Sequence, residues 1–231
     1  MRSSFVTILA APLLCALLQP AESLAQTIPS SFDYIERKQE VGFYAGYLDA
    51  ATGRFGFGPK GGRLVGPRYG LELAGPLSFE GVVGVISGTR DVIDPGRDEG
   101  DRKIGEADVL LPTIDARLRF SFAGERMWHK LSPFFTAGAG LVLDQSKASA
   151  LDETLLPEDV FDLGTSFYGT VGLGTRLFLS ESIALRGDGV FSLWKIGTPP
   201  GFSDPQRGFV GVEETEWARG LALTMTLLYR W

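Results

Sequence analysis

The last residues of the chain, 221–231, alternate large apolar side chains with small or polar ones. One face of this stretch carries Leu221, Leu223, Met225, Leu227, Tyr229 and Trp231. The other face carries Ala222, Thr224, Thr226 and Arg230, and only Leu228 breaks the alternation. Because successive side chains of a strand point to opposite faces, the pattern predicts a β-strand with one continuous apolar face. Aromatic rings at the end of that face are typical of a strand that meets a membrane boundary.

Seven more segments alternate in the same way, and the connections between them alternate in length. With the last one, the predicted strands cover residues 40–48, 68–74, 77–88, 109–122, 134–143, 166–179, 183–194 and 217–231. Short connections at 75–76, 123–133 and 180–182 alternate with long polar ones at 49–67, 89–108, 144–165 and 195–216. Single-chain outer-membrane barrels have an even number of strands, short periplasmic turns and long outer loops. The sequence therefore predicts an all-β fold, an eight-stranded antiparallel up-and-down transmembrane β-barrel with both termini in the periplasm.

The size of the side chains decides which face of the predicted strands is outside. The apolar face is bulky, with Phe79, Phe120 and Leu173 among its members, whereas the opposite face holds glycines and most of the charges. The interior of eight strands is only just wide enough to be filled by side chains. Glycines and charged residues are therefore expected inside and the apolar side chains outside, which argues against a soluble lipocalin-like barrel.

The N-terminal residues predict export. Arg2 is followed by an apolar stretch at 5–18 and by Ser23-Leu24-Ala25, the pattern of a signal peptide over residues 1–25. The barrel domain would then cover residues 26–231, with 26–39 as a short periplasmic tail. No run of about 20 apolar residues follows Gln26, so only a closed barrel could cross a membrane. A formal charge of −6 argues against nucleic-acid binding.

The inward face predicts a network of paired charges in the lumen. Its acidic members are Glu72, Glu80, Asp115 and Asp188, and its basic members are Arg117, Arg119, Arg176 and Arg186. A narrow lumen hydrates isolated charges poorly, so pairing offsets their desolvation. We expect a polar core that fills the barrel; the alternative is a gated conduit in which the pairs rearrange.

Two stretches resemble the OmpA-like family of eight-stranded outer-membrane barrels. They are Pro133-Phe-Phe-Thr-Ala-Gly-Ala-Gly140 and Gly172-Leu-Gly-Thr-Arg-Leu-Phe-Leu-Ser-Glu-Ser-Ile-Ala-Leu-Arg-Gly-Asp188, the second similar to a strand, tight turn, strand hairpin. The resemblance implies the fold and an integral place in the cell outer membrane. It also implies outer-membrane lipids and lipopolysaccharide as surroundings, a monomer, and recognition by the barrel-assembly machinery through the C-terminal strand. Leu227, Tyr229 and Trp231 would be the membrane-insertion signal.

Candidate chemistry is sparse. His129, the single histidine, falls in a predicted periplasmic turn, whereas the lipid A deacylases that this chain resembles in size need a histidine at the outer edge. The loops at 89–108 and 144–165 are acidic, but their spacing matches no ordered cation loop, so we expect solvated loops. No motif predicts a catalytic residue, a metal site or a cofactor.

These observations favour a non-enzymatic outer-membrane barrel with a structural or surface-interaction role. Two alternatives remain open. One is a narrow channel for small ions or hydrophobic molecules, implied by resemblance to OmpW-like barrels. The other is a lipid A-modifying acyl hydrolase or transferase.

Overall fold

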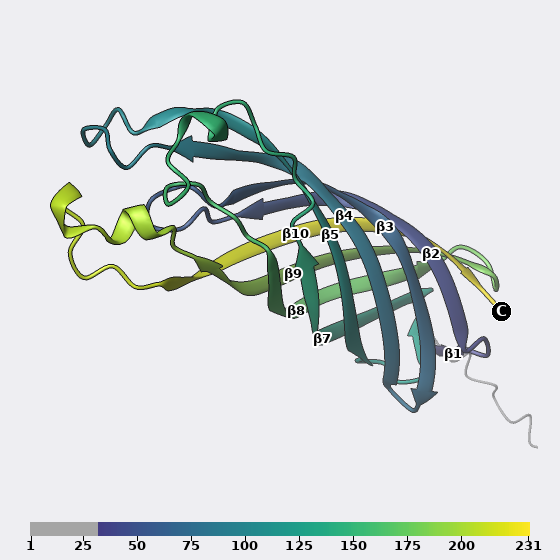
Figure 1. Ribbon diagram of the computed structural model, residues 1–231. Coiled ribbons are helices and arrows are strands. Elements are labelled where there is room, and N and C mark those ends of the chain that lie inside the picture. The colour runs from purple at the N-terminus through teal and green to yellow at the C-terminus, as the bar shows by residue number, and fades with distance from the viewer. Residues whose placement is uncertain (1–31) are drawn as a thin grey trace, which may run out of the picture. The chain divides into compact units, whose positions relative to one another are not determined.

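The computed structural model describes residues 32–231, which form an antiparallel β-barrel (Figure 1). Its eight strands are β2 (Gln39–Ala50), β3 (Pro59–Ala74), β4 (Leu77–Ile93), β5 (Lys103–Ser121), β7 (Leu131–Leu143), β8 (Thr165–Phe178), β9 (Ile183–Gly197) and β10 (Thr215–Arg230). Each pairs with the next along the chain, and β10 pairs with β2 from Arg230↔Glu40 to Gly220↔Ala50, which closes the barrel. The predicted fold class is confirmed. The predicted signal peptide lies outside the described residues.

Two shorter kinds of element complete the fold. The strands β1 (Phe32–Tyr34) and β6 (Arg126–Trp128) pair with each other at the end of the barrel that carries the short turns. The 3₁₀ helices η1 (Asp152–Thr154), η2 (Pro200–Ser203) and η3 (Pro205–Arg207) lie in the long connections at the opposite end. We call these two ends the turn end and the loop end. None of residues 32–231 lies in a helix that is long and apolar enough to cross a membrane.

Three strands, β3, β4 and β5, continue at least five residues further toward the loop end than the sequence predicts. β3 begins at Pro59 rather than at residue 68, and the β4–β5 hairpin reaches Ile93 and Lys103. The glycine-rich start of β3 reads as a loop in the sequence. In the structure Gly61 and Gly62 have φ of +91° and +152° and form a bulge, where a Cβ at Gly62 would lie 2.6 Å from the Cα of Gly88. These glycines therefore do not end β3. They allow its backbone to approach the neighbouring strands closely.

The outer face of the barrel is apolar, as predicted. Leu223, Leu227 and Leu173 are each about 60% exposed, and similar side chains surround the wall. Aromatic residues gather near both ends of this band: Tyr69, Tyr229 and Trp231 at the turn end, and Tyr47, Phe167 and Trp217 at the loop end. Such an apolar band between two aromatic girdles is the surface that a transmembrane barrel presents to lipid.

The interior has two halves of different character, and this corrects the prediction that only glycines and charges face inward. Toward the turn end the interior is charged. Toward the loop end it is a cluster of apolar side chains that includes Leu48, Ile86, Leu111, Val142 and Trp194. The sequence argument assigned the bulky side chains to one face along whole strands, so it missed the inward-facing apolar residues in the strand halves near the loops.

The predicted N-terminal tail is partly structured. Besides β1, Ile35 is buried against Phe178, Ala184 and Leu228, and its backbone N–H donates to the carbonyl of Glu125 at 2.8 Å. Leu228, the one residue that breaks the alternation of the last strand, faces inward and is 1% exposed. Its apolar side chain thus packs into a small core between the charged half of the lumen and the turn end.

Candidate functional site

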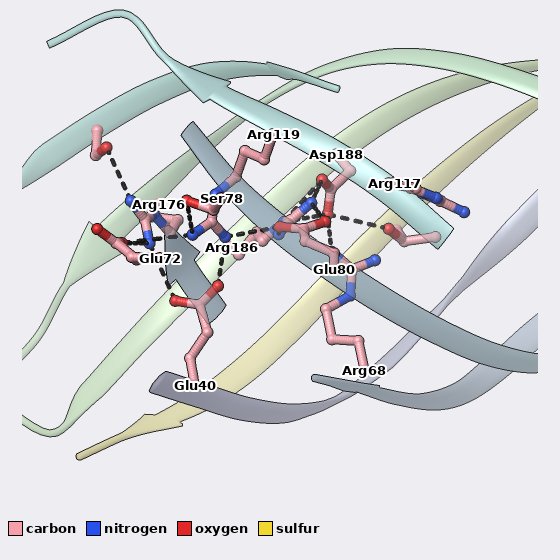
Figure 2. A network of polar contacts seen from close by, with 12 residues as sticks. Glu40, Arg68, Glu72, Ser78, Glu80, Arg117, Arg119, Arg176, Arg186 and Asp188 are labelled. Carbon is pink, nitrogen blue, oxygen red and sulfur yellow. Dashed lines mark hydrogen bonds and ion pairs between the residues drawn. The ribbon is translucent and has the colours of Figure 1, made fainter. Parts of the chain in front are cut away.

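A ladder of alternating arginines and carboxylates fills the charged half of the lumen (Figure 2). Asp188 and Glu80 lie on either side of Arg186, whose Nη2 is 2.6 Å from Asp188 and 3.0 Å from Glu80. Arg119 joins Glu80, at 2.7 Å, to Glu40. All eight residues predicted for the lumen charge network face inward, and six of them belong to this ladder. Together, the residues brought into it are Arg68, Asp188, Arg186, Glu80, Arg119, Glu40, Arg176, Glu72 and Arg230.

Asp115 and Arg117 form a separate pair above the ladder. The guanidinium of Arg117 donates to both oxygens of Asp115 through Nε and Nη2. The hydroxyl of Tyr168 also donates to Asp115, at 2.7 Å. This pair faces the apolar half of the lumen, so it marks the border between the two halves.

Three charged members were not predicted: Glu40, Arg68 and Arg230. Each lies at or near the first or last residue of a predicted strand, where the direction of a side chain is hardest to read from a sequence. Arg230 lies on the polar face of the C-terminal strand, so the alternation of that strand already indicated that Arg230 faces inward. With these three, the described lumen holds six guanidiniums and five carboxylates.

The ladder leaves no room for bulk water in the charged half. Arg119, Arg176 and Arg186 are each 0% exposed, and Glu80 is 1% exposed. Phe134 completes the filling: it is fully buried, and the guanidinium carbons of Arg186 and Arg119 lie 4.3 and 5.8 Å from its ring centroid. A Cβ at Gly174 would lie 2.5 Å from Phe134 Cζ, so glycine at this position makes space for the ring.

A cavity of about 70 Å³ lies above the ladder, inside the apolar half of the lumen. Its wall is formed by apolar side chains that include one from each of six strands: Leu48, Leu64, Ile86, Leu111, Val142 and Trp194. Its floor is polar and consists of Arg68, Arg117, Asp115, Tyr44 and Tyr168. The site is therefore amphipathic, with a charged base and apolar walls.

Phenylalanines from the long connections close the loop end. They are Phe55, Phe57, Phe161, Phe202 and Phe209, which we call the lid cluster. Phe57 packs against Phe161 and Phe202 with ring centroids 5.0 and 5.2 Å apart. Arg102, from the remaining long connection, lies over Phe209 at 4.7 Å. All four long connections thus meet at the loop end. The sequence predicted solvated loops at 89–108 and 144–165, and Phe161 was the signal against that prediction for the second of them.

Ion pairs, one of them buried, fix the lid. Asp152, in η1, accepts from Nη2 of Arg90 at 2.7 Å through both carboxylate oxygens. Arg207, in η3, donates to Asp159 at 2.6 Å and to Glu158 at 2.9 Å, which ties two connections together. Burial alone would raise the pKa of Asp152, but the hydrogen bonds from Arg90 and Ser149 outweigh it and lower that pKa. Two acidic residues that read as solvated therefore hold the lid in place.

We expect Asp152→Ala to loosen the connection at 144–164. At neutral pH the variant should be cut in this segment by a protease several-fold faster than the parent, while the strands stay protected. Because the pKa of Asp152 is lowered by folding, its contribution is present at neutral pH and is lost as pH falls below about 4 and the carboxylate becomes protonated. The parent should then approach the variant. Glu153→Ala, an exposed neighbour, is the control, and equal cleavage of both variants would contradict the pinning role.

His129 lies where the sequence predicts, in the turn between β6 and β7. It has φ of +47°, and the next residue, Lys130, has φ of +66°. Its ring packs edge-on against Trp128 at 4.8 Å. In the described part of the chain, no three His, Cys, Asp or Glu side chains form a group that could hold a metal ion.

Comparisons with known proteins show which solved structures share this fold. No protein-family model matches the sequence, and no curated protein matches it. Among solved structures, the chain is similar to the outer membrane protein OprG from Pseudomonas aeruginosa, with 15% identity, a TM-score of 0.53, and coverage of 86% of this chain and 99% of OprG. It is also similar to Neisserial surface protein A, with 16% identity, a TM-score of 0.51, and coverage of 87% and 98%. The closed barrel, its apolar outer band and these likenesses together show that the chain has the fold of the eight-stranded outer-membrane β-barrels.

Proposed function

We propose that this protein is a non-enzymatic outer-membrane barrel that acts at the cell surface and does not conduct. The charge ladder is the observation that carries the proposal. It joins side chains from seven of the eight strands, Phe134 from the remaining strand fills the space beside it, and its central arginines are fully buried. An ion crossing the barrel would have to break several paired, desolvated charges, which is costly in a narrow lumen.

The arrangement of the two ends supports an orientation. Short turns and both described ends of the chain lie at the turn end, and the long connections lie at the other (Figure 1). Barrels of this kind place short turns in the periplasm and long loops outside. In our proposal the loop end with its lid cluster therefore faces lipopolysaccharide and the medium, and the C-terminal strand with Leu227, Tyr229 and Trp231 is what the assembly machinery recognises.

Planar-bilayer recording tests the absence of conduction. We expect the purified, refolded protein to give no stepwise openings at neutral pH, because the ladder blocks the charged half of the lumen. Folding is checked in the same sample by heat-modifiable migration on gels. Stable openings from folded protein would contradict the proposal and favour the ion-channel alternative.

A second candidate function is the binding of a small hydrophobic molecule from the outer side. The observation that favours it is the apolar cavity between the ladder and the lid cluster. Small-molecule sites are concave, mostly apolar and carry a few placed polar groups, and this cavity has all three properties. Because the ladder closes its floor, such a molecule would be held in the outer half and not passed through the lumen.

A further inference from the structure

Arg68 lies at the cavity end of the ladder and uses little of its hydrogen-bonding capacity. Its side chain is 3% exposed and donates one hydrogen bond, from Nη1 to Asp188 at 3.0 Å. Asp188 also accepts two hydrogen bonds from Arg186, at 2.8 and 3.0 Å. The Nε of Arg68 is buried without any partner, as are those of Arg119, Arg176 and Arg230, and of these four arginines only Arg68 lines the cavity. A guanidinium has five N–H donors, and leaving a buried donor unpaired costs free energy.

Arg117 stands on the same cavity floor. It binds Asp115 through Nε and Nη2, so its Nη1 takes no part in that ion pair. Asp115 is already well supplied with donors, since Tyr168 binds it as well. The carboxylates beside the cavity are thus engaged, whereas the two guanidiniums retain unused N–H groups.

The charge balance of the lumen points to an anionic occupant. Six guanidiniums face five carboxylates, so the lumen residues that the structure describes carry one positive charge in excess. The ladder has an arginine at each end, Arg68 next to the cavity and Arg230 next to the turn end. A neutral molecule in the cavity would leave the excess positive charge uncompensated. A carboxylate would neutralise that charge and could accept a hydrogen bond from the Arg68 Nε.

We propose that the cavity binds a short-chain amphipathic monocarboxylate, with its headgroup on Arg68 and Arg117 and its chain against the apolar wall. This proposal rests on the second candidate function above and names its ligand class. The wall offers Leu64, Ile86, Leu111 and Trp194 to the chain. A cavity of about 70 Å³ suits a single short chain, not a diacyl lipid. The lid cluster belongs to the same apolar core as the cavity wall, on its loop-end side, so we expect it to part when the molecule enters.

Three probes of equal chain length test the headgroup. Isothermal titration of the protein refolded in nanodiscs would use hexanoate, hexanol and hexylammonium, with protein-free nanodiscs subtracted. We expect hexanoate to bind one site at least tenfold more tightly than hexanol, and hexylammonium to bind more weakly than either. This comparison needs no variant, so it remains decisive if a substitution in the ladder prevents folding.

Two variants locate the site. Arg68→Gln should reduce hexanoate affinity to that of hexanol and leave hexanol binding unchanged, and Ser192→Phe, which fills the cavity, should abolish both. Lys147→Ala, in an outer connection, is the control and should change neither. Equal affinity for hexanol and hexanoate would overturn the carboxylate proposal while keeping an apolar site. Absence of binding by every probe would overturn the carboxylate proposal and the second candidate function together, and unchanged hexanoate affinity in Arg68→Gln would place the headgroup elsewhere.

Discussion

Arg186→Ala is expected to lower the unfolding temperature of the barrel in detergent by roughly 10 °C. Arg186 is fully buried and is the only described residue that binds both Glu80 and Asp188. Without it, Asp188 keeps only Arg68 and Glu80 keeps only Arg119 as ion-pair partners. Removing one partner from a buried ion pair costs about 3–5 kcal/mol, because the remaining charge is left desolvated.

Arg97→Ala is the matched control for this prediction. Arg97 also pairs with carboxylates, Asp94 and Asp101, but its side chain is 49% exposed in the β4–β5 connection. Exposed ion pairs contribute about 0–1 kcal/mol, so its unfolding temperature should change little. The measurement is thermal unfolding followed by circular dichroism, with heat-modifiable migration as a second readout. Equal, small shifts of the unfolding temperature in the two variants would mean that water reaches the ladder. That result would favour the ion-channel alternative.

The number and order of the strands could be predicted from the sequence because the lipid-facing side chains repeat with a period of two. In β10 the pattern from Leu221 to Trp231 gave the correct face for every residue, including the break at Leu228. The charged residues were predictable for the same reason: a charge on the face opposite Phe79 or Leu118 can only point inward. What alternation cannot supply is the pairing. Arg119 reaches Glu40 across 79 residues of sequence, and that contact depends on how the strands are staggered around the barrel.

The apolar half of the lumen could not be predicted from alternation alone. In the part of β4 near the loops, Val85 faces outward and Ile86 inward, so both faces are apolar and the period of two disappears. The same holds for Leu110 and Leu111 in β5. The lid cluster posed a different difficulty. Phe55 and Phe57 stand in a glycine-rich connection, and nothing local indicates that they meet Phe161 and Phe202, which lie more than a hundred residues later.

The two halves of the lumen have complementary physical roles in our proposal. The charged half gives a floor that neither water nor a hydrophobic molecule can cross. The apolar half, closed by the lid cluster, gives a volume from which water is excluded and in which a guanidinium interacts strongly with an anion. An under-partnered arginine at the border, Arg68, is therefore more effective there than it would be at a solvated surface. A barrel sealed in this way can bind without transporting.

Phe134→Ala is expected to open the seal without altering any charge. The ring is fully buried between Arg119 and Arg186 and packs against the backbone of Gly174. Replacing a buried phenylalanine by alanine costs about 3–5 kcal/mol and leaves a cavity, here inside the charged half of the lumen. Polar walls favour hydration of that cavity, so water should enter between the paired charges.

Phe135→Ala, one residue further along β7, is a control with the same chemical change. Phe135 points outward and is 38% exposed on the lipid-facing side, so its removal creates no internal cavity and should cost much less stability. In planar bilayers we expect brief openings from Phe134→Ala and silence from both Phe135→Ala and the parent. Silence from a folded but destabilised Phe134→Ala would show that the ladder seals the barrel without help from the ring. Openings from Phe135→Ala as well would show that the seal depends on general barrel stability, and the specific role of Phe134 would be wrong.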